Sequence, residues 1–192
     1  GVKIITGDTK VVDKGKGDGI FINTSGVGII EHGLKIHPKS IQLDDAVLLS
    51  GDIGRHGIAI MAVREGLGFQ SQIESDCAAV SNLVQSLVDA DIEIHCMRDL
   101  TRGGLATALI EMAQTARVSI NITESEIPVR EDVKGACEIL GLDPLYVANE
   151  GRFVVVVKAE DAERALEVMQ NDPLGTQAKK IGEVKEAPQE TV

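Results

Sequence analysis

The segment Thr6-Gly7-Asp8-Thr9-Lys10 places residues that can do chemistry inside a stretch otherwise rich in Val and Ile. A glycine lets a ligand approach the backbone closely, the Asp8 carboxylate is a hard oxygen donor suited to Mg²⁺, and the Lys10 ammonium suits phosphate. The same residues are also typical of an edge strand of a β-hairpin whose polar side chains are solvated. The sequence leaves both interpretations open.

The segment from Arg98 to Leu105 is a second candidate, because a predicted strand ends there and passes through Gly103-Gly104 into a predicted helix. Backbone N–H groups at a helix N-terminus bind anions, and glycines let the anion come close. Asp99 or Thr101 could cap this helix or orient a metal ion. The spacing of a Walker loop is absent. A capped helix after a left-handed glycine turn explains the same residues without a ligand.

Polar residues at positions 148–152 directly precede the most apolar stretch of the chain, Val154 to Val157. A carboxylate at a strand edge that the valines partly desolvate, here Glu150, can act as a general base or a metal ligand. An ordinary Asn-Glu-Gly turn at 149–151 is the competing interpretation.

Three glycines frame His56 in the segment Gly51-Asp52-Ile53-Gly54-Arg55-His56-Gly57, ahead of a predicted helix. The segment resembles a phosphate-binding loop only loosely. Glycines at a strand-to-helix turn are also common for packing alone, so both interpretations stay open.

The three cysteines lack the spacing of a zinc site or of a disulfide framework. Cys77 and Cys137 fall on the apolar faces of predicted helices and Cys96 falls in a predicted strand, so all three are predicted to be buried hydrophobes. His95, beside Cys96, lacks the further ligands that a metal needs. Widely spaced cysteines in odd number favour a reducing cytoplasm.

The elements that must position these residues follow from the hydrophobic pattern. Helices are expected over about 57–65, 77–91, 103–117, 130–140 and 161–170, and strands over about 46–51, 93–98, 118–123, 152–158 and 178–184. Helices and strands mixed in this order predict an α+β or α/β layer domain over residues 37–186, followed by a tail at 187–192.

Residues 1–36 are predicted to be a separate part of the chain. Two strands, 2–12 and 19–30, are expected on either side of a turn of Gly, Lys and Asp at 13–18. An isolated hairpin is only marginally stable in water. Because the chain opens at Gly1 without Met, directly in a predicted strand, we expect it to begin in the middle of a longer protein.

The composition restricts the class of partner. Thirty acidic against 19 basic residues leave a net charge of -11, which repels polyanions, and one Tyr, three Phe and no Trp supply few surfaces for base stacking. We therefore expect no nucleic-acid partner. At 192 residues and 43% hydrophobic content the chain can bury a sizeable core, and its apolar runs are too short for a membrane span.

Three motifs together resemble the ordered signatures of the aminoimidazole ribonucleotide synthetase-like, or PurM-like, superfamily of ATP-dependent enzymes. They are Gly7-Asp8-Thr9-Lys10-Val11-Val12, Asp99-x-Thr101-Arg102-Gly103-Gly104-Leu105 and Asn149-Glu150-Gly151. Within this superfamily the chain resembles the HypE family of hydrogenase maturation proteins over nearly its whole length. Further segments that carry the resemblance are Phe21-Ile22-Asn23-Thr24, Gly54-x-His56-Gly57, Pro128-Val129 and Cys137-Glu138-x-Leu140-Gly141-Leu142-Asp143.

The resemblance implies a PurM-like C-terminal α/β layer domain, preceded by the last two strands of an N-terminal ATP-binding and dimer-forming domain. It implies a cytoplasmic homodimer that helps to make the cyanide ligands of the iron in nickel–iron hydrogenases. A C-terminal cysteine would receive a carbamoyl group from HypF, and ATP would drive dehydration of the thiocarbamate to a thiocyanate. The cyano group would then pass to iron held by the HypC–HypD complex.

The resemblance also implies roles for individual residues. Lys10 would contact the nucleotide phosphates or the activated carbamoyl oxygen, and Glu150 would assist deprotonation of the thiocarbamate nitrogen. Asp8 and Thr9 would belong to the ATP and Mg²⁺ edge, with Asp8 as the metal ligand. The further nucleotide-site residues would be Gly7, Asp99, Gly103, Gly104 and Asn149, with His56 and Arg102 at the cleft between the domains.

Two departures from the family pattern limit what the chain is expected to do. The family's N-terminal portion has no counterpart before Gly1, and its terminal cysteine has none after Val192, so the chain alone is expected not to complete the reaction. The alternatives are another superfamily enzyme, such as a selenophosphate synthetase or a thiamine monophosphate kinase, or a non-catalytic docking domain. Lys10 directly after Gly7-Asp8-Thr9, and Arg102 before Gly103, favour HypE.

Overall fold

The computed structural model describes residues 2–17, 19–66 and 73–188. The chain divides into two compact units, residues 1–31 and residues 32–192, and each is described by itself. None of the helices in the described ranges is long and apolar enough to cross a membrane.

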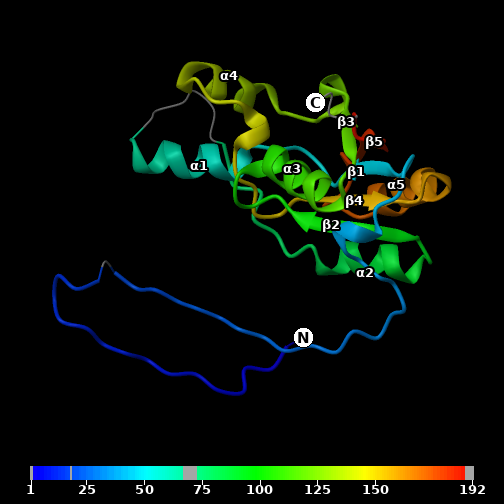
Figure 1. The fold of residues 1–192 in the computed structure, drawn as a ribbon. Coiled ribbons are helices and arrows are strands. Elements are labelled where there is room, and N and C mark those ends of the chain that lie inside the picture. Colours follow the sequence, from blue (N-terminus) through cyan, green and yellow to red (C-terminus); the bar gives the residue numbers. More distant parts are fainter. Residues whose placement is uncertain (1, 18, 67–72, 189–192) are drawn as a thin grey trace. The chain divides into compact units, whose positions relative to one another are not determined.

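The first unit follows an extended path that doubles back on itself (Figure 1). The turn lies where the sequence predicts it, and the Lys16 N–H donates to the Asp13 carbonyl at 3.0 Å. The described residues of this unit form no β-strand, although the sequence predicts two. Its apolar side chains, such as Ile5 and Phe21, are exposed. A hairpin without a neighbouring strand or a layer to pack on lacks the contacts that stabilise a ladder.

The second unit is built on a five-stranded sheet with the strand order β2-β4-β1-β5-β3, in which every neighbouring pair is antiparallel. The strands are β1 (Ala46–Leu49), β2 (Ile94–Asp99), β3 (Ser119–Ile122), β4 (Phe153–Val157) and β5 (Lys179–Lys185). The helices are α1 (Arg55–Arg64), α2 (Ser81–Asp89), α3 (Gly104–Ala116), α4 (Glu131–Leu140) and α5 (Ala162–Gln170). Short 3-10 turns lie at Pro38–Ser40, Glu124–Glu126, Pro144–Tyr146 and Ala159–Asp161.

Helices cover both faces of the central strands, because alternate residues of a strand point to opposite faces. Val47 and Leu49 of β1 pack in one apolar cluster with α3. Leu48 and Val155 pack in a second cluster on the other face, with α2 and α5. The fully buried valines of β4 are therefore explained by a strand covered on both faces, and the predicted α+β layer architecture is confirmed.

A third, smaller cluster joins α1 to α4 beyond the edge of the main core. Ile58 of α1 packs there with Val133 and Cys137 of α4 and with Val147. These two helices extend from the sheet (Figure 1) and frame one side of the loops described below.

The buried cysteines agree with the sequence prediction, but Cys77 does not. Cys96 and Cys137 are buried, and burial raises the pKa of the Cys96 thiol to about 11. Cys77 is exposed, because α2 begins only at Ser81 and the residues before it form a loop. The prediction of a helical, buried Cys77 was therefore wrong.

Candidate functional site

Three loops meet at one end of the sheet. β1 and β2 both end where β4 begins, because β4 runs antiparallel to each of them, with Leu49 opposite Val154 and Asp99 opposite Phe153. Residues 50–57, 99–104 and 147–152 are thereby brought together. The structure thus unites three of the four segments that the sequence singled out.

Asn149 holds these three loops in place. It is fully buried, and its side-chain carbonyl Oδ1 accepts the Gly54 N–H at 2.7 Å. Its Nδ2 donates to the Val147 carbonyl at 3.0 Å, and its backbone N–H donates to the Leu100 carbonyl at 3.0 Å. A buried amide with its polar groups satisfied in this way positions the loops.

Glu150 follows Asn149 and faces the opposite way, toward solvent. Its side chain is 42% exposed, and its Oε1 lies 3.9 Å from Nε2 of His56. Nδ1 of His56 in turn lies 2.9 Å from the Ser75 hydroxyl. Val154 to Val157 lie inside the sheet and Glu150 lies in the turn before it, so the partial desolvation of Glu150 by these valines stays a prediction.

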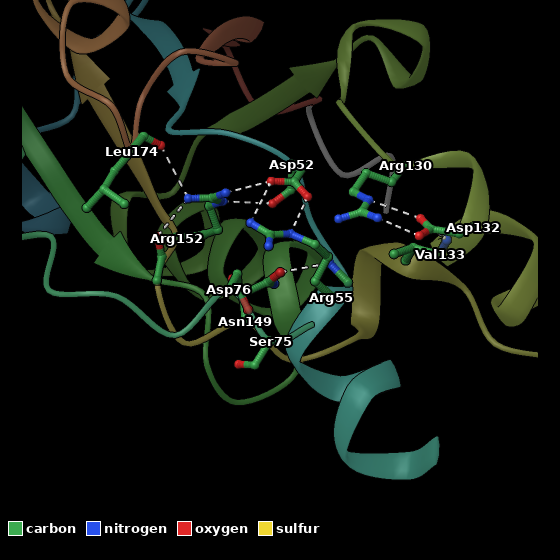
Figure 2. Close-up of polar contacts among 12 residues, drawn as sticks. Asp52, Arg55, Ser75, Asp76, Arg130, Asp132, Val133, Asn149, Arg152 and Leu174 are labelled. Carbon is green, nitrogen blue, oxygen red and sulfur yellow. Dashed lines mark hydrogen bonds and ion pairs between the residues drawn. The ribbon is translucent and has the colours of Figure 1, made fainter. Parts of the chain in front are cut away.

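Asp52 is the centre of a buried ion cluster beside this pair. Its Oδ1 accepts from Nη2 of Arg152 at 2.6 Å, and its Oδ2 accepts from Nε of Arg55 at 2.6 Å. Figure 2 shows both guanidinium groups directed at the one carboxylate. Burial alone would raise the pKa of Asp52, but hydrogen bonds and charge from Arg152 and Arg55 together lower it below its ordinary value. Asp52 is therefore ionised at neutral pH.

Arg152 serves mainly to join backbone segments. Besides Asp52, its guanidinium donates to the carbonyls of Gly151 and Leu174, at 3.2 and 3.3 Å. A Cβ atom at position 51 would lie only 3.0 Å from Nε of Arg152. Packing alone therefore accounts for the glycine at this position. The buried arginine thus ties the β1 and β4 ends to the loop before β5.

Asp76 borders the same cluster. It is 4% exposed, its Oδ1 accepts the Glu150 N–H at 3.4 Å, and its Oδ2 has no hydrogen-bond partner among the described residues. A cavity of about 410 Å³ lies here. Asp52, Arg55, Asp76, Cys77, Arg130, Arg152 and residues of the loop 173–177 line it.

The turn from Asp99 to Gly104 is shaped by packing. Asp99 accepts the Thr101 hydroxyl at 2.9 Å, and neither side chain caps α3. A side chain at Gly104, whose φ is +63°, would meet the Leu145 carbonyl oxygen at 2.5 Å. The sequence-based suggestion that Asp99 or Thr101 caps the helix was wrong, and the first N–H groups of α3 carry no side-chain cap. Arg102 is exposed.

The candidate nucleotide-binding residues of the first unit are described only within that unit. Gly7, Asp8, Thr9 and Lys10 are exposed, and Asp8 Oδ1 accepts the Thr9 N–H at 2.8 Å. Throughout the described ranges, no group of three or more His, Cys, Asp or Glu side chains converges as a metal site would require.

Residues 42–192 match the family described as AIR synthase related protein, C-terminal domain. The chain belongs to this family. Its sheet, with helices on both faces, is accordingly the C-terminal domain of the AIR synthase-related fold.

Relatives within this family confirm the resemblance to HypE. The chain is 52% identical to a hydrogenase expression/formation protein HupE from Azotobacter chroococcum and 52% identical to a carbamoyl dehydratase HypE from Azotobacter vinelandii. Each match covers 96% of this chain and 54% of the relative. A carbamoyl dehydratase HypE from Escherichia coli is 41% identical. The chain thus spans about half the length of the curated relatives it matches.

Solved structures give the same result for the fold. A HypE–HypF complex matches with a TM-score of 0.79 and 43% identity, over 82% of this chain and 52% of that one. A HypE structure in complex with ATP matches with a TM-score of 0.77 and 42% identity, over 80% of this chain and 46% of that one. A thiamine monophosphate kinase from Aquifex aeolicus shares the fold at 17% identity, with a TM-score of 0.51.

The charged residues around Asp52 were not among the sequence-based candidates in this AIR synthase-related domain. The candidate segments were chosen for their glycines and for His56 and Glu150, although they also contain Asp52, Arg55 and Arg152. Asp76 was not singled out. Opposite charges at positions 52 and 55, directly after a buried strand, were an available signal for an ion pair near a strand end. The pairing with Arg152, a hundred residues away, carried no sequence signal.

Proposed function

We propose that this chain contributes the C-terminal half of an ATP-dependent carbamoyl dehydratase. The reaction would convert an enzyme-bound S-carboxamide to a thiocyanate, whose cyano group becomes a ligand of the hydrogenase iron. The names of the relatives that are about half identical to the chain support this activity. The observation that carries the proposal is the exposed Glu150 carboxylate beside His56, on loops that Asn149 holds rigid.

Dehydration of the carboxamide would remove both hydrogens of the nitrogen as protons, one as the carbonyl oxygen is phosphorylated and one as that oxygen leaves as phosphate. Glu150 would take a proton from that nitrogen, because an exposed carboxylate at the sheet end can reach a bound substrate. His56, 3.9 Å away, would hold the carboxylate in place and receive or return the proton. Ser75 would orient the imidazole through the contact at Nδ1.

ATP, when bound, would supply the phosphoryl group that makes the carbonyl oxygen a leaving group. Two features, each within its own unit, support this cofactor: Lys10 of the first unit offers a cation, and α3 of the second unit begins at Gly103 and Gly104 without a side-chain cap. Gly7 and Thr9 of the first unit, and separately Asp99 of the second, are the further residues proposed to take part in nucleotide binding. Asp8 alone does not make a magnesium site, so no step is assigned to Mg²⁺.

The proposed partners are HypF and the HypC–HypD complex, and a solved structure bears on the first of them. The solved HypE–HypF complex supports HypF as the carbamoyl donor. HypC–HypD would accept the cyano group, and a cytoplasmic homodimer would be the working form. The non-catalytic docking domain is the alternative that the test below separates.

The test uses the protein extended to the length of its relatives, with a terminal cysteine as carbamoyl carrier. Lys10→Ala and Glu150→Ala should both accept a carbamoyl group and fail to form thiocyanate, because each removes a group needed only for dehydration. Mass spectrometry of the terminal peptide distinguishes the two adducts. Normal thiocyanate in both variants would refute these two roles, whereas no thiocyanate from the unaltered protein would favour a docking domain.

A further inference from the structure

A second cavity, of about 600 Å³, lies beside α4 and has no role in the proposed dehydration. Its walls come from residues 124–129, from α4 and from residues 142–145. Among the described residues, none lines both this cavity and the 410 Å³ cavity beside Asp52. Cavities of roughly 300–1,000 Å³ are typical of ligand sites, so this one has room for a ligand.

The lining of this cavity divides into an apolar floor and a polar rim. The lining residues that are buried or half-buried are all apolar, and they form the floor: Ile127, Val129, Cys137, Leu142, Pro144 and Leu145. The lining residues that are exposed are all polar or charged, and they form the rim: Glu124, Ser125, Glu131, Lys134, Glu138 and Asp143. Such a lining favours a ligand with an aliphatic group, because covering the floor removes apolar surface from water.

The rim carries an excess of negative charge. It holds four carboxylates against one ammonium group, that of Lys134, which leaves three net negative charges. Among the described residues, the carboxylates of Glu124, Glu131 and Glu138 form no ion pair. α4 also ends beside the rim, at Leu140, and the C-terminus of a helix carries partial negative charge. The rim therefore favours a cation.

Backbone hydrogen bonds fix two of the walls before any ligand binds. The Ile127 N–H donates to the Glu124 carbonyl at 3.0 Å, and the Leu142 N–H donates to the Cys137 carbonyl at 2.9 Å. A preformed site needs less ordering when a ligand binds, so more of the contact energy appears as affinity.

We propose that this cavity docks a segment of a partner protein that carries an aliphatic side chain next to Lys or Arg. The aliphatic side chain would cover the floor. The cation would lie against Glu131 and Glu138, which are seven residues apart on α4 and so share a face. An acidic segment would meet like charges there. The site needs neither Glu150 nor ATP, so it stands or falls separately from the dehydration.

Nuclear magnetic resonance titration of the isotope-labelled 192-residue chain with three peptides tests the proposal. The probe is Gly-Lys-Leu-Leu-Lys-Gly with blocked ends. It should bind about tenfold or more tightly than Gly-Glu-Leu-Leu-Glu-Gly, which lacks the cations, and than Gly-Lys-Ser-Ser-Lys-Gly, which lacks the aliphatic side chains. Its shift changes should fall on residues of this cavity, such as Glu138 and Leu142, and not on Ser75 of the other cavity.

Reversal of the rim charges should reverse the preference. The rim variant, Glu131→Lys with Glu138→Lys, should bind the acidic peptide more tightly than the basic one. Glu163→Lys with Glu167→Lys, at exposed positions on α5, is the matched control. It changes the net charge of the chain equally and should keep the preference for the basic peptide.

Circular dichroism shows whether the rim variant folds. If it does not, Glu131→Gln with Glu138→Gln replaces it, and this variant should reduce the preference for the basic peptide. Equal binding of the three peptides by the unaltered chain, or no binding, would overturn the proposal. Shift changes outside the cavity, or an equal loss of the preference in the rim variant and in the control, would overturn it as well.

Discussion

Neighbouring residues in the Asn149-Glu150 motif have opposite roles. The Asn149 side chain forms hydrogen bonds with Gly54 and Val147, whereas the Glu150 carboxylate is exposed beside His56. The sequence predicted that this motif holds polar groups at a strand edge. It could not predict which group is free to act, because that depends on a loop almost a hundred residues away.

His95 gives a prediction at the residue scale, on a buried cluster away from the loops. Its Nδ1 lies 2.7 Å from Asp45 and its Nε2 lies 3.3 Å from Glu93. Burial alone would lower the pKa of His95, but the hydrogen bonds and charges of the two carboxylates raise it above 6.5. The charged imidazolium therefore stabilises the fold fully below the unfolded pKa, and this contribution is lost as the pH rises through the higher folded value.

We expect the free energy of unfolding to fall between about pH 6 and about pH 8.5. Urea unfolding at the two pH values measures it. His95→Gln should remove most of this fall, whereas His32→Gln, at an exposed position, should keep it. An unchanged pH dependence in His95→Gln would show that the cluster is not its source.

At the scale of elements, hydrophobic periodicity predicted all five helices and all five strands of the second unit, with ends displaced by up to four residues. Periodicity could not reveal that α2 begins at Ser81, which left Cys77 in a loop. Periodicity also could not predict the order of the strands in the sheet, since β1 pairs with β4 and β5, which both follow it by more than a hundred residues.

The glycine at the start of α3 gives a prediction at this scale. Gly104→Ala should lower the free energy of unfolding by about 2 kcal/mol or more, because the residue has φ +63° and its new methyl would meet the Leu145 carbonyl oxygen at 2.5 Å. Gly135→Ala is the matched control, since the space beside Gly135 in α4 is open. That substitution should stabilise by about 0.5–1 kcal/mol through helix propensity. Equal effects of the two substitutions in urea unfolding would contradict this packing account.

At the scale of the whole molecule, the two units differ in how they are stabilised. The sheet and its three apolar clusters lie within residues 32–192, whereas Ile5, Phe21 and Ile29 of the first unit are exposed. The predicted start of the layer domain at residue 37 stays a prediction. The two strands expected before residue 31 need a neighbouring sheet, which sequence reasoning on this chain cannot supply.

Removal of residues 1–31 should therefore leave a cooperative unfolding transition and the same midpoint in urea, because no buried cluster is lost. It should also reduce concentration-dependent self-association, since exposed apolar patches promote it. Urea unfolding and light scattering measure the two effects. Loss of cooperativity on truncation would mean that the first unit contributes to the core.

Glu150 is proposed to remove the proton from the substrate nitrogen, and the rate of dehydration without its carboxylate tests that claim. In the protein extended to full family length, the carbamoylated terminal peptide is followed by mass spectrometry after addition of ATP, for Glu150→Gln and for the surface control Glu163→Gln on α5. We predict that Glu150→Gln retains the carbamoyl adduct with dehydration slowed at least about a hundredfold, as for loss of a general base, while Glu163→Gln behaves like the unaltered protein. Thiocyanate formed by Glu150→Gln at the unaltered rate would contradict the claim.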